Sequence, residues 1–414
     1  MRTSPIQEST FKTFMESYDG YSHYLHDTLY YDYISKIQEV HLLGLYEDDV
    51  LIGVSMLSAT PVLKRYRLFT SHTGPLIKGF NNERLEFFLG EIDAYVKKNH
   101  ALKLIHSPYH IYQVRNGEGE VLHSEKNNPG IVDIYTRLGY THQGFTKQLV
   151  TEELLRHQAI LDITKSEDEL VKNMDSKTRY NTRAVEQMDL KLRYLDEDEY
   201  DKFIDIYKDT EERIGFDPVS SQKIKNLLKT LKDKTYLTLS YIEIDVYLER
   251  LNKELGSLEA DKIGMEEKLE SGQGTKRMKG RLNETKDLVA NKRKRIAKIE
   301  EVQKEYGNTI ELSAAMYYYN NHEMVYLFSG SYPEHSMFMG TNFTTWEMIR
   351  KAKEMGLPRF NFFGLTGDFT EDSKDYGVYK FKKGYNTFIE ELPGTFYKVF
   401  NKPVHKIAEK MNKI

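Results

Sequence analysis

Three lysines surround one phenylalanine in the stretch KFKKGY, residues 380–385. A lysine ammonium is a compact point charge that can hold a substrate phosphate or stabilise a negative charge that develops during a reaction. The same pattern is also typical of a solvated basic turn or of a contact to nucleic acid. The residue types alone therefore leave three interpretations of this stretch open.

Several other kinds of catalytic chemistry find no support in the sequence. The 414 residues include no cysteine, which excludes disulfides, a thiolate nucleophile and cysteine-ligated zinc. No Ser-His-Asp arrangement or metal-ligand spacing is evident, and His106 and His110 lie on either side of Pro108, which does not suit a helical metal pair. We expect no bound metal and no cofactor.

Composition limits the partners and the location of the protein. Lys plus Arg number 59 against 63 Asp plus Glu, a formal net charge of −4, so the molecule as a whole has no field that would attract nucleic acid. Any polyanion must be bound by a local basic patch. The start of the chain has no signal-peptide pattern, and no run of about 18 apolar residues occurs. The sequence therefore predicts a cytoplasmic protein.

The lysines of residues 380–385 follow elements that occur twice in the same order: a hairpin, a helix and a strand. In the first half these elements are expected at residues 41–46 with 50–59, 83–98 and 102–107. In the second half they are expected at residues 311–319 with 324–331, 344–355 and 359–364. This order predicts two copies of one α+β unit with a ligand groove between them, although chance recurrence of common motifs is an alternative.

A segment of another kind interrupts the second half. Apolar residues alternate spacings of four and three from Ile244 to Leu269 and again from Met278 to Gln303, which predicts an antiparallel coiled coil. Such an arm would project roughly 40 Å, and its returning limb is strongly basic. The predicted register leaves two weak layers, which are Lys262 with Thr285 and Leu255 with Lys292.

Four stretches carry a resemblance to a known family. They are GVYKFKKGYN, NFFGLTGDFTED, KNMDSKTRYNTRAVE (residues 172–186) and LSATPVLKRYRLFTSHTGPLI (residues 57–77). With the arm, they resemble the Fem family of peptidoglycan aminoacyltransferases, of the FemA/FemB type, over almost the whole chain. The resemblance implies two acetyltransferase-like (GNAT-like) subdomains, a coiled-coil arm, an aminoacyl-tRNA donor and a peptidoglycan precursor as acceptor.

This resemblance completes the predicted organisation. The fold class is α+β, with two GNAT-like subdomains and an inserted antiparallel coiled-coil arm. We expect subdomain A at residues 1–148, subdomain B at residues 149–243 and 307–396, the arm at residues 244–306, and a C-terminal helix at residues 397–414 that packs on subdomain A.

The resemblance also implies roles for single residues. Fem enzymes have an aromatic-lysine pair where their substrates meet, and Phe381 and Lys382 match it. Lys382 would place its charge on a substrate phosphate or on the developing oxyanion, while Phe381 packs the groove. Lys36 and Arg213 occupy places where relatives hold the precursor's diphosphate. Further substrate-binding candidates are Tyr109, Lys383 and Tyr385.

Two basic clusters are candidates for binding the donor tRNA. Arg179 and Arg183 are four residues apart, which suits a site for RNA phosphate or precursor phosphate, or equally an ordinary helix surface. The other cluster lies on the returning limb of the arm and consists of Lys292, Arg293, Lys294 and Arg295. One departure from the family pattern is Ser107, where relatives often have an aspartate before the proline, and it favours a mechanism led by positioning.

The predicted function is transfer of glycine or serine from glycyl- or seryl-tRNA to the interpeptide bridge of a lipid-linked peptidoglycan precursor. The protein would lie near the inner face of the membrane, touch the membrane only through its substrate, and form a homodimer or pair with a related Fem-type protein. The sequence leaves two alternatives open, an acetyl-CoA-dependent N-acetyltransferase and a non-catalytic RNA-binding or scaffold protein. Against the acetyltransferase, no Arg/Gln-x-x-Gly-x-Gly/Ala turn for a pyrophosphate is found.

Overall fold

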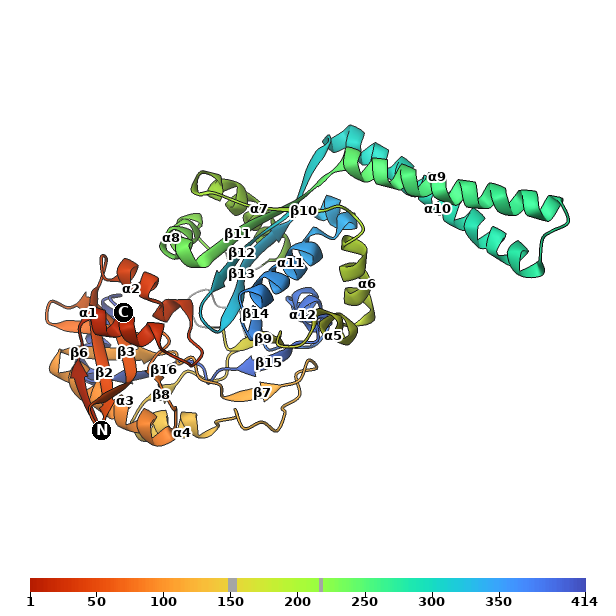
Figure 1. Ribbon diagram of the computed structural model, residues 1–414. Helices are drawn as coiled ribbons and strands as arrows, with labels where there is room; N and C mark the ends of the chain where they lie inside the picture. The colour runs from red at the N-terminus through yellow and green to blue at the C-terminus, as the bar shows by residue number, and fades with distance from the viewer. Residues whose placement is uncertain (148–154, 216–218) are drawn as a thin grey trace.

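The computed structural model describes residues 1–147, 155–215 and 219–414. Within these ranges the chain forms two eight-stranded sheets, each covered by helices, and a long helical arm that leaves the second sheet (Figure 1). The mixed α+β class and the inserted arm predicted from the sequence are confirmed.

The first sheet is built mainly from the first part of the chain. Its strand order is β1 (Arg2–Pro5), β2 (Glu39–Glu47), β3 (Val50–Val62), β4 (Tyr66–Ser71), β6 (Ala101–His106), β16 (Phe396–Val399) and β8 (Thr141–His142), with β5 (Leu76–Ile77) paired to β3. Its helices are α1 (Glu8–Glu16), α2 (Thr28–Ile34), α3 (Asn82–Lys98), α4 (Gly130–Arg137) and α13 (Lys402–Lys410). Apolar residues of β2, β3, β6, α3 and α4 form its main core.

The second sheet carries the larger set of helices. Its strand order is β10 (Lys191–Tyr194), β11 (Thr235–Glu243), β12 (Thr309–Tyr319), β13 (Glu323–Ser331), β14 (Arg359–Leu365), β9 (His157–Asp162), β15 (Phe388–Glu391) and β7 (Gln113–Arg115). Its helices are α5 (Glu167–Asn173), α6 (Ser176–Val185), α7 (Tyr200–Ile214), α8 (Ser221–Leu231), α11 (Gly340–Glu354) and α12 (Tyr376–Gly384). The core on one face is centred on Trp346 and Phe360, and α7 and α8 cover the other face.

The two sheets correspond strand by strand. The antiparallel run β1-β2-β3-β4 matches β10-β11-β12-β13, and in both sheets a helix then leads to a parallel strand, through α3 to β6 and through α11 to β14. The repeated unit is thus confirmed, but the predicted match between the hairpins is wrong by one strand. The sequence interpretation overlooked β4, so the hairpin β3-β4, not β2-β3, corresponds to β12-β13.

The chain crosses between the two sheets, so that β7 joins the second sheet and β16 joins the first. β9 follows β8 in sequence but pairs between β14 and β15, whereas β16 follows β15 but pairs between β6 and β8. β7, which lies within residues 1–148, also pairs with β15 of the second sheet. Because of this reciprocal exchange, neither sheet can complete its pairing without the other half of the chain.

The arm consists of α9 (Ile244–Glu270) and α10 (Lys276–Tyr306), inserted between the neighbouring strands β11 and β12. Most of its buried residues fall on the predicted seam, among them Leu251, Leu282, Val289 and Ile296, whereas the buried Tyr247 lies outside that seam. In the predicted weak layer at Lys292, the ammonium lies 2.6 Å from the Glu254 carboxylate of the facing helix. Among the described residues, no helix combines the length and the apolar character needed to cross a bilayer.

Candidate functional site

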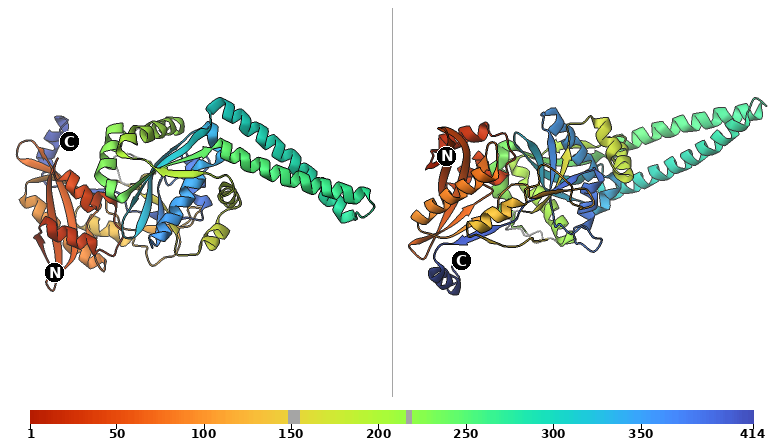
Figure 2. Two further views of the ribbon diagram at one scale, coloured as in Figure 1. Left: turned by 45° about the horizontal axis from the view of Figure 1, so that its top comes forward. Right: turned by 90° about the horizontal axis from the view of Figure 1, so that it is seen from below.

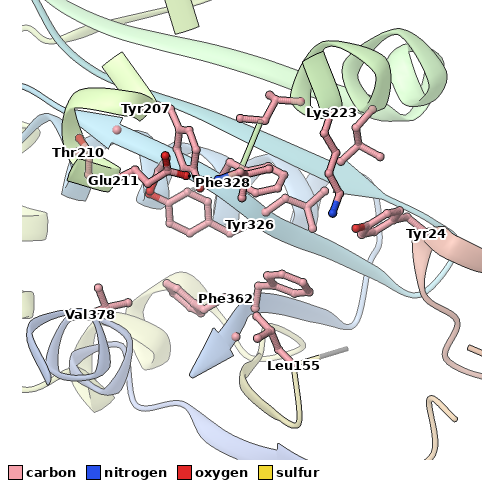
Figure 3. A pocket seen from close by; sticks show the side chains of 18 of the residues that line it. Tyr24, Leu155, Tyr207, Thr210, Glu211, Lys223, Tyr326, Phe328, Phe362 and Val378 are labelled. Atoms are coloured by element: carbon pink, nitrogen blue, oxygen red, sulfur yellow. Dashed lines mark hydrogen bonds between the residues drawn. The ribbon is translucent and has the colours of Figure 1, made fainter. Parts of the chain in front are cut away.

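The second sheet opens between two of its central strands. β13 and β14 pair in parallel only where residues 323–325 face residues 359–361, although both strands continue beyond that point. In β14 the pairing with β9 shifts between Asn361 and Gly364, and Phe363 adopts a positive φ of 62°, which is unusual for a bulky side chain. Figure 3 shows Tyr326 and Phe328 on one side of the opening and Phe362 on the other.

A cavity of about 940 Å³ occupies this opening and extends to the first unit. Backbone and side chains of β13, β14, α7, α8 and α12 line it, and so do residues around α2. Its aromatic lining residues in the second unit are Tyr207, Tyr326, Phe328, Phe362, Phe363 and Phe381. Aromatic side chains of the second unit thus line one part of the cavity, and residues of both units line the other part. This arrangement suits a site where two substrates meet.

Lys382 is the buried cation of this cavity. Its side chain is only 8% exposed, and its Nζ donates a hydrogen bond of 2.6 Å to the carbonyl oxygen of Gly364 on β14. Burial lowers the pKa of Lys382 to about 7, and the negative charge of the buried Asp375 partly opposes this shift. The Lys382 amine can therefore gain or lose a proton near neutral pH, which is a common property of functional lysines.

The opening stretch KFKKGY lies in a helix, not in a turn or loop. Lys380 to Gly384 form the last part of α12, and Lys382 occupies its buried face. Lys380 lies over the ring of Tyr376 at 5.4 Å, and Lys383 forms an ion pair of 3.0 Å with Glu118. The interpretation as an exposed basic turn therefore fails for Lys382, because its side chain points inward and lines the cavity.

The histidines at the cavity are neutral near pH 7. Burial lowers the pKa of His23 to about 3 and that of His72 to about 4, with neighbouring histidines contributing to the shift of His23. His106 and His110, considered above as metal ligands, are buried and have lowered pKa values of about 3 and about 4. Within the described parts of the chain, no group of His, Cys, Asp and Glu side chains has the arrangement of a metal site.

Comparison with known proteins identifies the family of this chain. The model of the FemAB family matches residues 6–413. The chain belongs to the FemAB family. Aminoacyltransferase FemA of Staphylococcus aureus (strain bovine RF122 / ET3-1) is 34% identical over 418 residues, with 100% of this chain and 99% of that protein covered. The FemA of strain N315 gives the same identity and coverage.

A solved structure supports the fold of this FemAB protein. The crystal structure of FemX superimposes with a TM-score of 0.78 at 22% identity, covering 99% of this chain and 100% of that one. At this identity the likeness bears on the fold alone. Together with the topology described above, it confirms the predicted class of two GNAT-like α+β units with an inserted arm.

Three of the predicted site residues of the FemAB protein lie at the cavity. Phe381 and Lys382 line it from α12, and Arg213 lines it from the last turn of α7. The Arg213 side chain is exposed, and its Nη2 donates to the Thr210 hydroxyl at 3.5 Å. The structure thus brings together a buried lysine and an exposed arginine from segments far apart in the sequence.

The other substrate-binding candidates lie outside the cavity lining. Tyr385 is fully buried and packs against Phe362, with ring centroids 5.0 Å apart. Lys383 faces Glu118, and Lys36 is exposed just after α2. From α2 it is Tyr30 and Tyr33 that reach the cavity.

Tyr109 belongs to a buried polar network at the closed end of the opening. Its hydroxyl lies 2.8 Å from Gln158 Oε1 and 3.2 Å from Glu323 Oε1, and its one hydrogen can be donated to either oxygen. Arg359 of β14 bonds Glu323 of β13 at 2.9 Å and Glu390 of β15 at 2.8 Å, all of them buried. This network joins the two strands where they still pair and links them to the loop of the first unit that carries Tyr109.

The helices that carry the two basic clusters predicted for tRNA both border a cavity at the base of the arm. A second cavity, of about 540 Å³, lies between α6, the arm and residues 336–339, and its lining includes Tyr180, Lys292 and Arg295. Arg179 and Arg183 are on the same helix as Tyr180. The pairing of Arg293 with Glu259 and of Lys292 with Glu254 leaves less positive charge on this limb than the sequence suggested.

Sequence reasoning missed most of the cavity wall. Tyr326 and Phe328 stood in a strand that had been recognised, but nothing in the sequence shows that this strand diverges from its neighbour. Glu211 was also missed; it is buried on α7, bonds Lys208 at 2.6 Å and accepts from the Val219 amide at 2.8 Å. Ser107, the departure from the family pattern, bonds Thr395 at 2.9 Å and does not line the cavity.

Proposed function

We propose that this FemAB protein is an aminoacyltransferase that moves glycine or serine from its tRNA to the interpeptide bridge of a lipid-linked peptidoglycan precursor. The observation that carries the proposal is the cavity in the opened second sheet, with Lys382 buried in its wall. Membership of the FemAB family and the full-length similarity to aminoacyltransferase FemA support the reaction class.

The reaction needs positioning more than acid-base catalysis. The bridge amine attacks the ester carbonyl of the aminoacyl-tRNA, a C–N bond forms, the C–O ester bond breaks, and the amine proton ends on the released ribose hydroxyl. The ester is already activated, so the main requirements are to hold the two substrates together and to stabilise the tetrahedral oxyanion. In its protonated form, Lys382 supplies a preorganised donor and a positive charge for that oxyanion.

The two ends of the cavity suit the two substrates. The aromatic walls inside the second unit would hold the aminoacylated end of the tRNA by stacking, which is how proteins commonly bind unpaired bases. Arg213 at the mouth would hold the diphosphate of the precursor with its fork of donors. Phe381 would pack the groove beside the reacting groups, and Lys36, Tyr109, Lys383 and Tyr385 would act from outside the cavity lining.

The body of the tRNA would bind along the arm base. Tyr180 of α6 and Lys292 and Arg295 of α10 line the second cavity, while Arg179 and Arg183 lie on α6 outside its lining. Basic groups with an exposed ring form a suitable surface for RNA. The protein would work in the cytoplasm near the inner face of the membrane, as a homodimer or with a related Fem-type partner.

Mass spectrometry of the acceptor tests this function. Purified protein is given glycyl-tRNA or seryl-tRNA and a precursor that already bears the start of a bridge, with acetyl-CoA in a parallel reaction. We expect an increment of one glycine or one serine and none from acetyl-CoA. An acetyl increment would favour the acetyltransferase instead, and no increment with any charged tRNA would favour the scaffold.

A further inference from the structure

The last helix, α13, exposes an apolar stripe on the surface of the first unit. Ile407 and Met411, one helical turn apart, are each 53% exposed, and Ile414 is 38% exposed. Ile407 lies on α13, Met411 caps the end of this helix, and Ile414 lies in the short segment that follows. Ile407 and Met411, four residues apart, lie on the same side of the last helical turn. Exposed large apolar side chains that occur singly need no explanation, but three within eight residues form a patch that calls for one.

The opposite face of α13 fixes its orientation. Ala408 is fully buried and packs with Val404 against Val62 and Leu102 of the first sheet. At the start of the helix, the Asn401 side chain accepts from the Val404 amide at 3.2 Å. Because α13 is anchored in this way, its apolar stripe must face outward. Figure 2 shows α13 standing out from the first unit, at the end of the molecule away from the arm.

Cations surround the stripe. Lys402, Lys406, Lys410 and Lys413 are all exposed, and residues 402–414 contain a single acidic residue, Glu409.

A second segment adds to this charge. The turn between β3 and β4 packs against α13 through Leu63 and Tyr66, and the Tyr66 hydroxyl accepts from Asn401 at 3.1 Å. This turn exposes Lys64 and Arg65. Two segments far apart in the sequence thus gather six cations around one apolar stripe, on a chain whose formal net charge is −4.

We propose that α13 and the β3-β4 turn form a docking surface for an anionic lipid membrane. Aliphatic side chains at the centre can enter the boundary between headgroups and acyl chains, while the surrounding lysines and arginine meet the phosphates. This surface would hold the enzyme at a membrane by direct contact, whereas the sequence led us to expect contact through the substrate alone. The proposal does not depend on the transfer reaction.

Two other occupants fit the surface less well. RNA would be attracted by the cations, but residues 402–414 offer no Phe, Tyr or Trp for stacking, and RNA gains little from isoleucine and methionine. A second copy of the chain related by two-fold symmetry would place the same six cations opposite one another, and like charges brought together repel.

Vesicle co-sedimentation of the full chain tests the proposal. One set of vesicles contains only phosphatidylcholine and the other about 30% phosphatidylglycerol, at about 0.1 M salt. We expect binding to the anionic vesicles alone and loss of binding at high salt. The stripe variant combines Ile407→Ser, Met411→Ser and Ile414→Ser, and the charge variant combines Lys406→Glu, Lys410→Glu and Lys413→Glu.

Each variant should weaken vesicle binding by about tenfold or more. Matched controls on the arm change side chains that are equally exposed but lie far from α13, and both should bind as the wild type does. The apolar control is Ile263→Ser with Leu288→Ser, and the charge control is Lys276→Glu with Lys279→Glu and Arg281→Glu. Circular dichroism checks that every variant is folded.

Three results would overturn the proposal. The first is that the wild type binds neither vesicle. The second concerns RNA binding, measured by gel shift. The proposal fails if the charge variant loses RNA binding, the stripe variant keeps it, and neither variant changes vesicle binding. The third is a dimer in light scattering that the stripe variant turns into a monomer without any change in vesicle binding.

Discussion

The first and second sheets share one central run of strands, but among the described residues these strands stay paired in the first sheet and part around a cavity in the second. In the first sheet, β4 and β6 pair along residues 67–71 and 101–106 to the end of both strands. Aromatic rings fill the space beside β6, where Tyr135 stacks on Phe396 at 4.2 Å and His106 lies 5.5 Å from Tyr135. In the second sheet, the corresponding strands β13 and β14 part after three pairs.

The comparison shows where the function of a duplicated fold resides. Strand order, direction and crossover are the same in both units, so none of them accounts for the cavity. The differences are local: a register shift in β14, the positive φ of Phe363, and a helix that directs a lysine to the carbonyl of Gly364. In this molecule the repeated topology supplies the scaffold, and the divergence of two strands supplies the site.

The largest effect is expected from removing the buried charge of Lys382, which lines the cavity of the second unit. Lys382→Ala should cost roughly 2 to 4 kcal/mol of transition-state stabilisation, the usual scale for one preorganised group. The neighbouring Lys380→Ala is the matched control and should change the rate little, because Lys380 is exposed and lies over the ring of Tyr376. Initial rates of transfer measure both. Equal rates for Lys382→Ala and wild type would remove Lys382 from the mechanism.

A second prediction concerns the pH dependence of stability. Burial lowers the pKa of Lys382 to about 7 in the folded protein, from an ordinary value of 10.5. Between these values the unfolded chain binds more protons at this residue than the folded protein does, so the free energy of unfolding rises with pH. Lys382→Met removes this titration. The stability of the wild type relative to this variant should therefore increase by roughly 3 to 4 kcal/mol between about pH 7 and pH 10 and change little at lower pH.

Urea unfolding of both proteins across this pH range measures the effect. If the difference between wild type and Lys382→Met is flat, the lysine titrates normally, and the opened sheet does not hold it in the buried state described above.

The smallest effect concerns the arm. It joins two strands of the second unit whose counterparts in the first unit are joined by a short turn. β2 and β3 are joined at Asp48 and Asp49, whereas the corresponding strands β11 and β12 are joined through α9 and α10. Combining Arg293→Glu with Lys294→Glu should weaken tRNA binding several-fold and reduce the slope of log affinity against log salt by about 1 or more. Lys97→Glu with Lys98→Glu on α3 is the matched control. Should both pairs of changes leave tRNA binding as it was, the arm has another role.

The sequence was sufficient for the family, the class and the arm because these depend on patterns that are local or repeated. Heptad spacing placed the buried residues of α9 and α10, and the stretch around Lys382 carried the family resemblance. The pairing of β7 in the second sheet and of β16 in the first could not be predicted, since short strands with a similar apolar pattern fit either sheet. The placement of Tyr109 and Tyr385 in buried networks depends on tertiary packing, which residue types do not reveal.

The cavity itself could not be predicted from the sequence, for a physical reason. Residues 324–331 have the pattern of an ordinary paired strand, and the loss of pairing with β14 arises from the bulge and from the helices packed on either side. The inward direction of Lys382 depends in turn on where α12 begins and ends. Only the assembled unit decides which of the three lysines is buried.

The central claim is that transfer occurs in the cavity of the second unit, and a pair of glycine substitutions tests it most directly. Gly377 lines the cavity from α12, Gly90 lies within α3 of the first unit, and a Cβ at either position would meet no atom within 4 Å. Both positions therefore have room for the first atom of a new side chain, and circular dichroism checks that Gly377→Phe and Gly90→Phe fold. In the mass-spectrometric assay of the acceptor, we predict that Gly90→Phe transfers as the wild type does and that Gly377→Phe loses most of its activity. Full activity of a folded Gly377→Phe protein would contradict the account.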